Sequence, residues 1–186
     1  MRSEELIQHH RNHVLDTLTL LLNSCPPASE VEGLPDLKAI KEFIEARTIT
    51  EVSELTSFDI GQLHLVRSQF RAIFTVPDTP TRIQLVNEAL TSARIAPRLV
   101  EHDHLGTHFH YFPPYVSLSE HIKADCAMAL ALLISSGEIE RLKICNRPGC
   151  YRVFVDSSRN RSRAFCDSKT CGARVHAAAY RLRLQN

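Results

Sequence analysis

The sequence predicts a mainly α-helical N-terminal domain with a small β-hairpin, followed by a small α+β treble-clef-like zinc finger. Apolar residues recur at helical spacing through residues 1–95, and an alternating pattern typical of strands appears near residues 98–112. Four of the six cysteines follow residue 140. We therefore expect two domains, residues 1–140 and 141–186, in a chain long enough to bury a core without disulfides.

Four helices are expected before the alternating segment, at positions 4–22, 36–46, 60–76 and 79–93. In each of them apolar residues lie three or four positions apart, which places them on one face of a helix. Asp59 and Asp78 precede the third and fourth helices. We expect both to be N-caps, because a carboxylate accepts hydrogen bonds from the unpaired amides of the first turn.

A hairpin and a long helix complete the expected N-terminal domain. Residues 98–103 and 107–112 are expected to form two strands, because polar and apolar residues alternate in the second segment. Ser117 and Glu120 have the spacing of a capping box and should open the helix. Gly137 should end it, since glycine adopts the left-handed conformation common after a helix.

The cysteines after residue 140 form two pairs. Four residues separate Cys145 from Cys150, four separate Cys166 from Cys171, and 15 lie between the pairs. Each pair suits a tight turn that directs both sulfurs toward one ion, and four thiolates close a tetrahedral zinc shell. We therefore expect Zn²⁺ as the cofactor.

Two further elements are expected around the second cysteine pair. A hairpin should form between residues 151–156 and 163–165, which lie on either side of a polar turn. A helix should cover Gly172–Leu184, because this segment is rich in alanine.

Other uses of the four cysteines stay open at this point. Two disulfides would require an oxidising compartment, but the N-terminus lacks the pattern of a signal peptide. A catalytic zinc would keep an open position, and iron–sulfur clusters usually have other spacings. Oxidation of the thiolates could release zinc, and His176 could replace one cysteine. The longest apolar runs are too short to cross a bilayer, so we expect a cytoplasmic protein without membrane contact.

The formal net charge of +1 conceals two halves of opposite sign. Residues 1–140 carry 11 Lys/Arg and 19 Asp/Glu, whereas residues 141–186 carry 11 and 2. Basic segments bind phosphates and release their counterions, so we expect a nucleic acid as the partner. The alternatives are a solvated tail and a docking surface for an acidic protein or for the N-terminal half. The candidate contact residues are Arg159, Arg161, Arg163, Lys169, Arg174, Arg181 and Arg183.

The predicted hairpin also carries His102, His104, His108 and His110. Alternation places His108 and His110 on one face of their strand, so a second metal site is an alternative to a polar surface. Residues 1–140 contain no glycine-rich phosphate loop, no nucleophile elbow and no acid pair with a partner. We therefore predict no enzymatic activity, and a metal-dependent enzyme using these histidines is the remaining alternative.

The C-terminal segment resembles the CGNR zinc finger. The residues that carry the resemblance are Cys145, Cys150, Phe154, Asp156, Ser158-Arg159-Asn160, Ser162-Arg163, Cys166, Cys171-Gly172 and Arg174. In this family the finger usually follows a helical ABATE domain, in bacterial stress-induced transcription regulators. Leu21-Leu22-Asn23-Ser24 is similar to ABATE. One position departs from the motif: Ala173 stands where the family has asparagine, and no metal ligand is lost.

The resemblance implies the protein's partners and function. It implies zinc on the four cysteines, double-stranded DNA as the partner and a role in transcription regulation. The N-terminal domain would sense an unidentified small molecule or assemble the protein. A single finger of this kind would bind DNA weakly, so specific binding is expected to need a homodimer. The alternative function is a zinc-stabilised module for protein–protein interaction.

Overall fold

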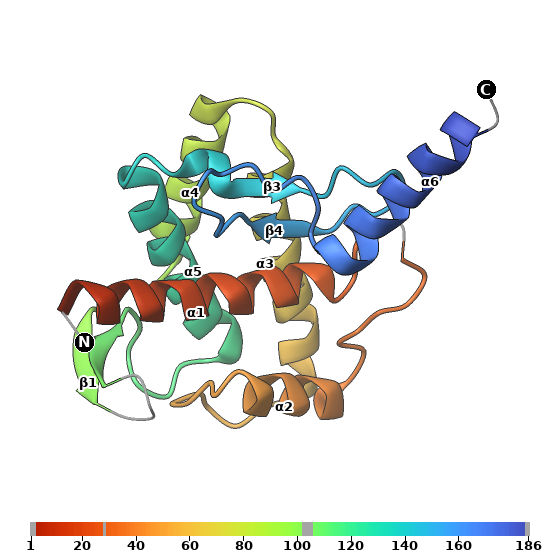
Figure 1. The fold of residues 1–186 in the computed structure, drawn as a ribbon. Coiled ribbons are helices and arrows are strands. Elements are labelled where there is room, and N and C mark those ends of the chain that lie inside the picture. The colour runs from red at the N-terminus through yellow and green to blue at the C-terminus, as the bar shows by residue number, and fades with distance from the viewer. Residues whose placement is uncertain (1–2, 28, 102–105, 185–186) are drawn as a thin grey trace.

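The computed structural model describes residues 3–27, 29–101 and 106–184 (Figure 1). The N-terminal part comprises α1 (Ser3–Asn23), α2 (Leu37–Ala46), α3 (Ser57–Thr75), α4 (Thr79–Ser92), β1 (Arg98–Glu101), β2 (Thr107–His110) and α5 (Leu118–Ser135). The C-terminal part comprises the 3-10 turn η2 (Ile139–Arg141), β3 (Leu142–Ile144), β4 (Val153–Val155), the π turn η3 (Ser168–Gly172) and α6 (Ala173–Leu184). The predicted fold class is confirmed.

Helix starts follow the local signals in the sequence. The side chains of Asp36, Asp78 and Ser117 accept hydrogen bonds from the third residue of α2, α4 and α5, as N-caps do. The expectation that Asp59 caps α3 is wrong. That helix begins at Ser57, and the Asp59 carboxylate accepts hydrogen bonds from the amide and hydroxyl of Thr56. Asp59 therefore has the acidic position of a capping box, in the first turn of the helix.

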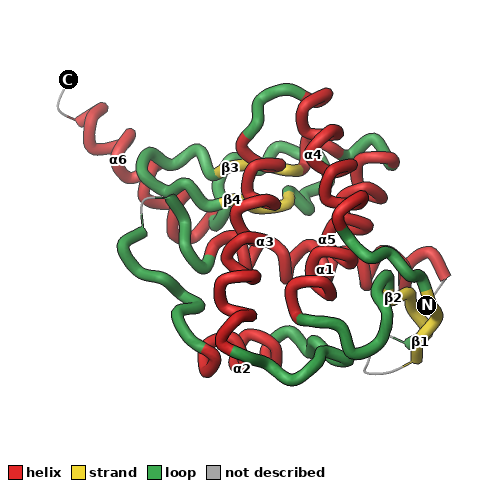
Figure 2. Tube along the Cα trace, turned by 180° about the vertical axis from the view of Figure 1, so that it is seen from behind, coloured by secondary structure: helices red, strands yellow, loops and turns green. Residues whose placement is uncertain are grey.

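Helix α5 is the centre of the helical part and packs against α1, α3 and α4 (Figure 2). Residues along most of its length are buried, including Leu118, Ile122 and Leu130. A helix surrounded by other helices is expected to be apolar on several sides, which agrees with the sequence of α5. At one end of α5 the antiparallel pair β1–β2 closes over the N-terminal half of α1.

The small sheet β3–β4 shares the hydrophobic core of the helices. Leu142 of β3 and Val153 of β4 belong to the same buried cluster as Leu18 and Phe70. The sheet contacts α3 through β3 and α1 through β4. The C-terminal part is therefore docked directly on the helices. Its division from the N-terminal part after residue 140, which falls within η2, stays a prediction.

The predicted hairpin between residues 151–156 and 163–165 is wrong. Strand β4 pairs instead with β3, with Leu142 opposite Val155. The turn between β3 and β4 contains Gly149 at φ +74°, a conformation that suits glycine and lets the chain reverse over a few residues. Residues 163–165 lie beside the end of β3, where the Asn146 amide donates to the Ala164 carbonyl at 2.9 Å.

Within the described residues, no helix combines the length and the apolar character needed to cross a bilayer.

Candidate metal centre and basic surface

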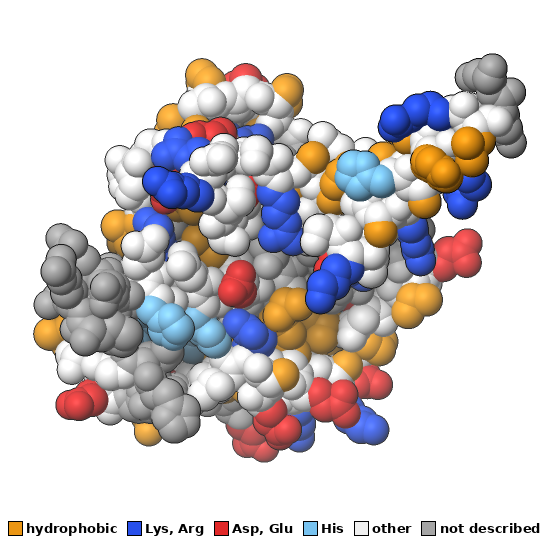
Figure 3. Space-filling view, viewed as in Figure 1, with side chains coloured by type: hydrophobic (Ala, Val, Ile, Leu, Met, Phe, Trp, Pro, Cys, Tyr) orange, Lys and Arg blue, Asp and Glu red, His pale blue; other side chains and the backbone are white. Residues whose placement is uncertain are grey.

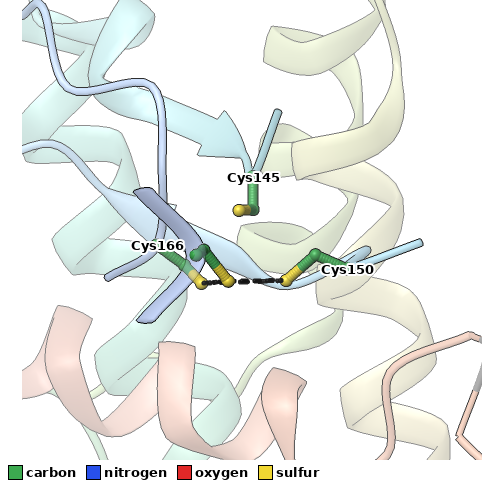
Figure 4. Close-up of side chains that lie close together, drawn as sticks. Cys145, Cys150 and Cys166 are labelled. Atoms are coloured by element: carbon green, nitrogen blue, oxygen red, sulfur yellow. Dashed lines mark hydrogen bonds between the residues drawn. The ribbon is translucent and has the colours of Figure 1, made fainter. Parts of the chain in front are cut away.

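Two turns of the chain bring four cysteine sulfurs together (Figure 4). Cys145 and Cys150 lie in the turn between β3 and β4, whereas Cys166 precedes η3 and Cys171 lies within it. The four sulfur atoms lie within 4.8 Å of one another. The Cys150 sulfur is 3.8 Å from that of Cys166 and 3.6 Å from that of Cys171, and the last two are 3.6 Å apart.

These distances fit a tetrahedral metal ion. Zinc–thiolate bonds of about 2.3 Å require sulfur atoms about 3.8 Å apart at the corners of a tetrahedron. A disulfide requires about 2.05 Å, and all the cysteines are free thiols. Three of the four residues are buried and Cys166 is half-buried. The donor set therefore fits a closed, structural metal site.

The thiols in this cluster have opposite pKa shifts. Burial raises the pKa of Cys150, but hydrogen bonds from the Arg152 amide and the neighbouring thiols outweigh it and lower the pKa to about 7. Burial and the same neighbours raise the pKa of Cys166. Four thiolates at this spacing repel each other, so a bound cation is needed for all of them to be ionised. The Arg147 guanidinium adds positive charge by donating to the Cys171 sulfur at 3.2 Å.

The second cysteine turn depends on a close approach at Gly172. A Cβ atom at this position would lie 3.3 Å from the ring of Phe165, which is tighter than ordinary contact. Phe165 and Phe154 pack against the sulfur cluster. Asp167 caps η3 by accepting from the Thr170 amide at 2.6 Å. Ala173, where the family motif has asparagine, is exposed at the start of α6.

Asp156 holds the loop between β4 and the second cysteine pair. Its side chain is fully buried and accepts from Lys143 Nζ at 2.6 Å, from the Ser158 hydroxyl at 2.6 Å and from the Arg163 amide at 2.8 Å. Burial raises the pKa of Asp156, but these hydrogen bonds outweigh it and hold the pKa well below its usual value. The sequence analysis noted Asp156 as part of a motif, whereas its role as a buried hub depends on contacts that spacing does not show.

The candidate DNA-contacting residues fall into two groups. Arg161 and Arg163 form contacts within the protein, whereas the other five side chains are exposed. Arg161 forms ion pairs with Glu138 and Glu140. Arg163 is half-buried over the ring of Phe154 and donates to the Phe165 and Cys166 carbonyls. In the second group every residue is exposed: Arg159, Lys169, Arg174, Arg181 and Arg183.

Helix α6 carries most of this second group and projects from the body (Figures 1 and 2). Its main contact is with η3, and none of its residues is buried. Figure 3 shows basic side chains along it. Tyr180, Leu182 and Leu184 are also exposed there. The cysteine cluster therefore lies at one end of a basic helix whose remaining surface faces solvent.

Two histidines of the hairpin, His108 and His110, are buried, contrary to the expected polar surface. His108 and His110 lie on the inner face of β2, where alternation places them together. They meet His10 of α1 and His121 of α5. His102 and His104 lie outside the described residues.

The sequence analysis did not place His10, His121 and Asp125 beside the histidines of the hairpin. Burial lowers the pKa of His10 to about 4, so its ring is neutral near pH 7. Asp125 of α5 is also buried, and its carboxylate is 3.5 Å from His121 Nε2. The available signal was the spacing of His121 and Asp125, four residues apart on one face of α5. Among the described residues, however, only the four cysteines place three or more ligand atoms within 4.8 Å of one another.

Two family models match the chain. The ABATE model, with the description "Putative stress-induced transcription regulator", matches residues 15–137. The CGNR zinc finger model matches residues 141–184. No curated protein matches the chain.

Proposed function

The chain belongs to the ABATE family and carries a CGNR zinc finger after its ABATE region, and from this we propose that it is a cytoplasmic, zinc-dependent DNA-binding regulator of transcription. The main support is the basic helix α6, which projects from the cysteine cluster with its arginines exposed. The proposal assigns a structural role to the metal and no catalytic role to any residue.

Zinc would be held by Cys145, Cys150, Cys166 and Cys171. Zinc is favoured over other ions because it accepts four thiolates in a tetrahedron, and the sulfur spacing suits that geometry. When bound, the ion would neutralise the thiolates and link the first cysteine turn to the second. The first turn is fixed to the core by β3 and β4, so the link would orient η3 and α6 against the rest of the protein.

The DNA contact would be made mainly by α6. Its 12 residues make a rod of about 18 Å, and the major groove is wide enough to accept a helix. Arg174 and Arg181 are seven residues apart and share a face, with small alanines between them that permit close approach. Lys169 and Arg159 would contact phosphates beside this helix. Arg161 and Arg163 would position the module through the intramolecular contacts described above.

A homodimer and an effector complete the proposal. One finger offers a small contact area, so two copies would be required for a specific site. The effector would be a small molecule or ion bound by the helical part. A zinc-stabilised protein-interaction module is the second candidate, favoured by the exposed Tyr180, Leu182 and Leu184 beside the arginines of α6.

The decisive test is binding to mixed duplex DNA across a salt series. The double variant Arg174→Ala/Arg181→Ala should bind more weakly and reduce the slope of log K against log salt by about 2, because each lost phosphate contact contributes about 0.9. The control removes two positive charges elsewhere, in Lys41→Ala/Arg94→Ala, and should keep the wild-type slope. If the zinc-loaded protein does not bind DNA at low salt, the protein-interaction function replaces this one.

A further inference from the structure

A cavity rich in histidine lies between α1, β2 and α5. It has a volume of about 50 Å³, and the histidines in its wall are His10, His13, His108, His110 and His121. A second cavity of about 310 Å³ shares His10, His108 and Asp125 with it and is otherwise mainly apolar. Figure 3 shows histidine side chains over the N-terminal half of α1. The β1–β2 hairpin and α6 lie at opposite ends of the molecule (Figures 1 and 2), so this cavity is remote from the cysteine cluster.

The Nδ1 atoms of His108 and His110 each lie beside a hydrogen-bond acceptor. His108 Nδ1 is 2.7 Å from the Gly106 carbonyl oxygen, which can only accept, so Nδ1 carries the hydrogen. His110 Nδ1 is 2.9 Å from a carboxylate oxygen of Glu51, which also accepts. Arg98 is farther from this nitrogen, at 3.3 Å, and forms an ion pair with the same carboxylate. In both rings Nε2 is the nitrogen that faces the other ring.

The two Nε2 atoms lie 3.2 Å apart. At this distance a single cation, either a proton or a metal ion, can bridge them. Nitrogen ligands at about 2.0–2.1 Å from one metal ion are about 3.0 Å apart in octahedral and about 3.4 Å apart in tetrahedral geometry. The spacing of His108 and His110 thus suits two ligands of one ion. Hydrogen bonds from Nδ1 to a carboxylate and to a backbone carbonyl are also typical of histidines that bind metal.

His10 provides a second, independent observation. Both of its ring nitrogens are buried and have no hydrogen-bond partner among the described residues. Its ring centre is 4.6 Å from that of His108. His121, which is 8% exposed, also has an unpartnered buried Nδ1 in the same cavity. Buried polar atoms are nearly always paired in proteins, so this group of nitrogens indicates a ligand.

We propose that His10, His108 and His110 bind a divalent first-row transition-metal ion of the kind that prefers imidazole, such as Ni²⁺, Cu²⁺ or Zn²⁺. The His10 ring, whose centre is 4.6 Å from that of His108, would supply the third nitrogen. Asp125, which is buried in the same wall, and Glu51, behind His110, would balance the positive charge. The site is separate from the cysteine centre and does not depend on DNA binding.

The test uses the full-length, untagged protein with its finger loaded with zinc, and Ni²⁺ as the probe. Calorimetry and elemental analysis should find about one Ni²⁺ per chain in addition to zinc. His108→Ala/His110→Ala should lose the Ni²⁺ and keep the zinc. The matched control is His9→Ala, since His9 is exposed next to His10 on α1, and it should bind Ni²⁺ as the wild type does.

Two measurements keep the proposal testable if the double variant fails to fold. Glu51→Gln keeps the size of the side chain and should weaken Ni²⁺ binding about tenfold to hundredfold, because it disturbs the hydrogen bond that orients His110. X-ray absorption at the nickel edge should show nitrogen and oxygen neighbours with imidazole scattering. Sulfur neighbours, absence of Ni²⁺ binding, or equal binding by wild type, Glu51→Gln and the histidine variants would overturn the proposal.

Discussion

Asn23 and Val153 form two hydrogen bonds with each other across 130 positions of sequence. The Asn23 side chain donates to the Val153 carbonyl at 2.8 Å, and the Val153 amide donates to the Asn23 side-chain oxygen at 3.0 Å. The amide side chain thereby takes the place of a neighbouring strand at the edge of β4. The C-terminal end of α1 is thus bonded to the strand that follows the first cysteine turn.

Replacing Asn23 should destabilise the whole protein. Asn23→Ala leaves the amide and carbonyl of fully buried Val153 without partners, at a cost of about 2 kcal/mol in the free energy of unfolding. Urea unfolding measures this change. Asn23→Asp keeps the acceptor and loses the donor, so it should be destabilised as well. A loss below about 0.5 kcal/mol in Asn23→Ala would contradict the structural role of this pair.

Removing one thiolate should unfold the second cysteine turn and leave the helical core intact. Cys166→Ser should lose the metal, and η3 and α6 should then exchange their amide hydrogens faster, because they are in contact mainly with each other. Strands β3 and β4 should stay protected, since Leu142 and Val153 are part of the main core. Hydrogen exchange with mass spectrometry and elemental analysis measure both effects. Cys25→Ser, which changes a cysteine outside the cluster, serves as the control; retention of metal by Cys166→Ser would refute the four-cysteine site.

Stability should fall in acid as Glu32 becomes protonated. Hydrogen bonds from Arg67 lower the pKa of Glu32 from its usual 4.5 to about 2. A folded-state pKa below the unfolded one stabilises the protein above about pH 4.5, and this contribution is lost as the pH falls toward 2. Glu32→Gln should therefore have a lower Tm at pH 7 and a smaller decrease in Tm between pH 5 and pH 2.5. The exposed Glu54→Gln is the control, and equal pH profiles for Glu32→Gln and wild type would exclude this linkage.

Adding one methyl group at Gly172 should weaken the metal site. Gly172→Ala forces the Phe165 ring to move by a few tenths of an ångström, and overpacking of this kind costs about 1 kcal/mol, or about fivefold in metal affinity. Competition with a chromophoric chelator measures the affinity. Ala173→Asn, which restores the family motif at an exposed position, should bind metal as the wild type does. If the two variants bind metal equally, the contact at Gly172 has no role in the site.

Local signals in the sequence account for the parts of the fold that were predicted. The N-caps Asp78 and Ser117 act within one turn of their own helices, so spacing alone identifies them. The mainly helical fold class follows from periodic segments long enough to show their period. The cysteine pairs indicated a metal site because their spacing differs from that of ordinary core residues.

The features that the sequence did not predict depend on contacts between distant segments or on a choice between equivalent residues. Strands β3 and β4 have three residues each, too few to show alternation, and their pairing depends on the turn at Gly149 and on the buried Asp156. Asp59 and Thr56 are both good N-cap residues, and the sequence does not decide between them. The histidine cavity combines His10, His108 and His121 from three elements, so no single segment reveals it.

The shared core of the helices and the β3–β4 sheet limits how this finger could be exchanged between proteins. A finger joined by a flexible linker can be transferred to another protein as a unit, because its removal leaves the other domain unchanged. Here a cut after residue 140 would remove Leu142 and Val153 from the core and leave Asn23 without its strand. Any transplant would have to carry the contacting faces of α1 and α3 with it. Chimeras should therefore be joined after β4, beyond residue 155, so that the recipient keeps its own sheet.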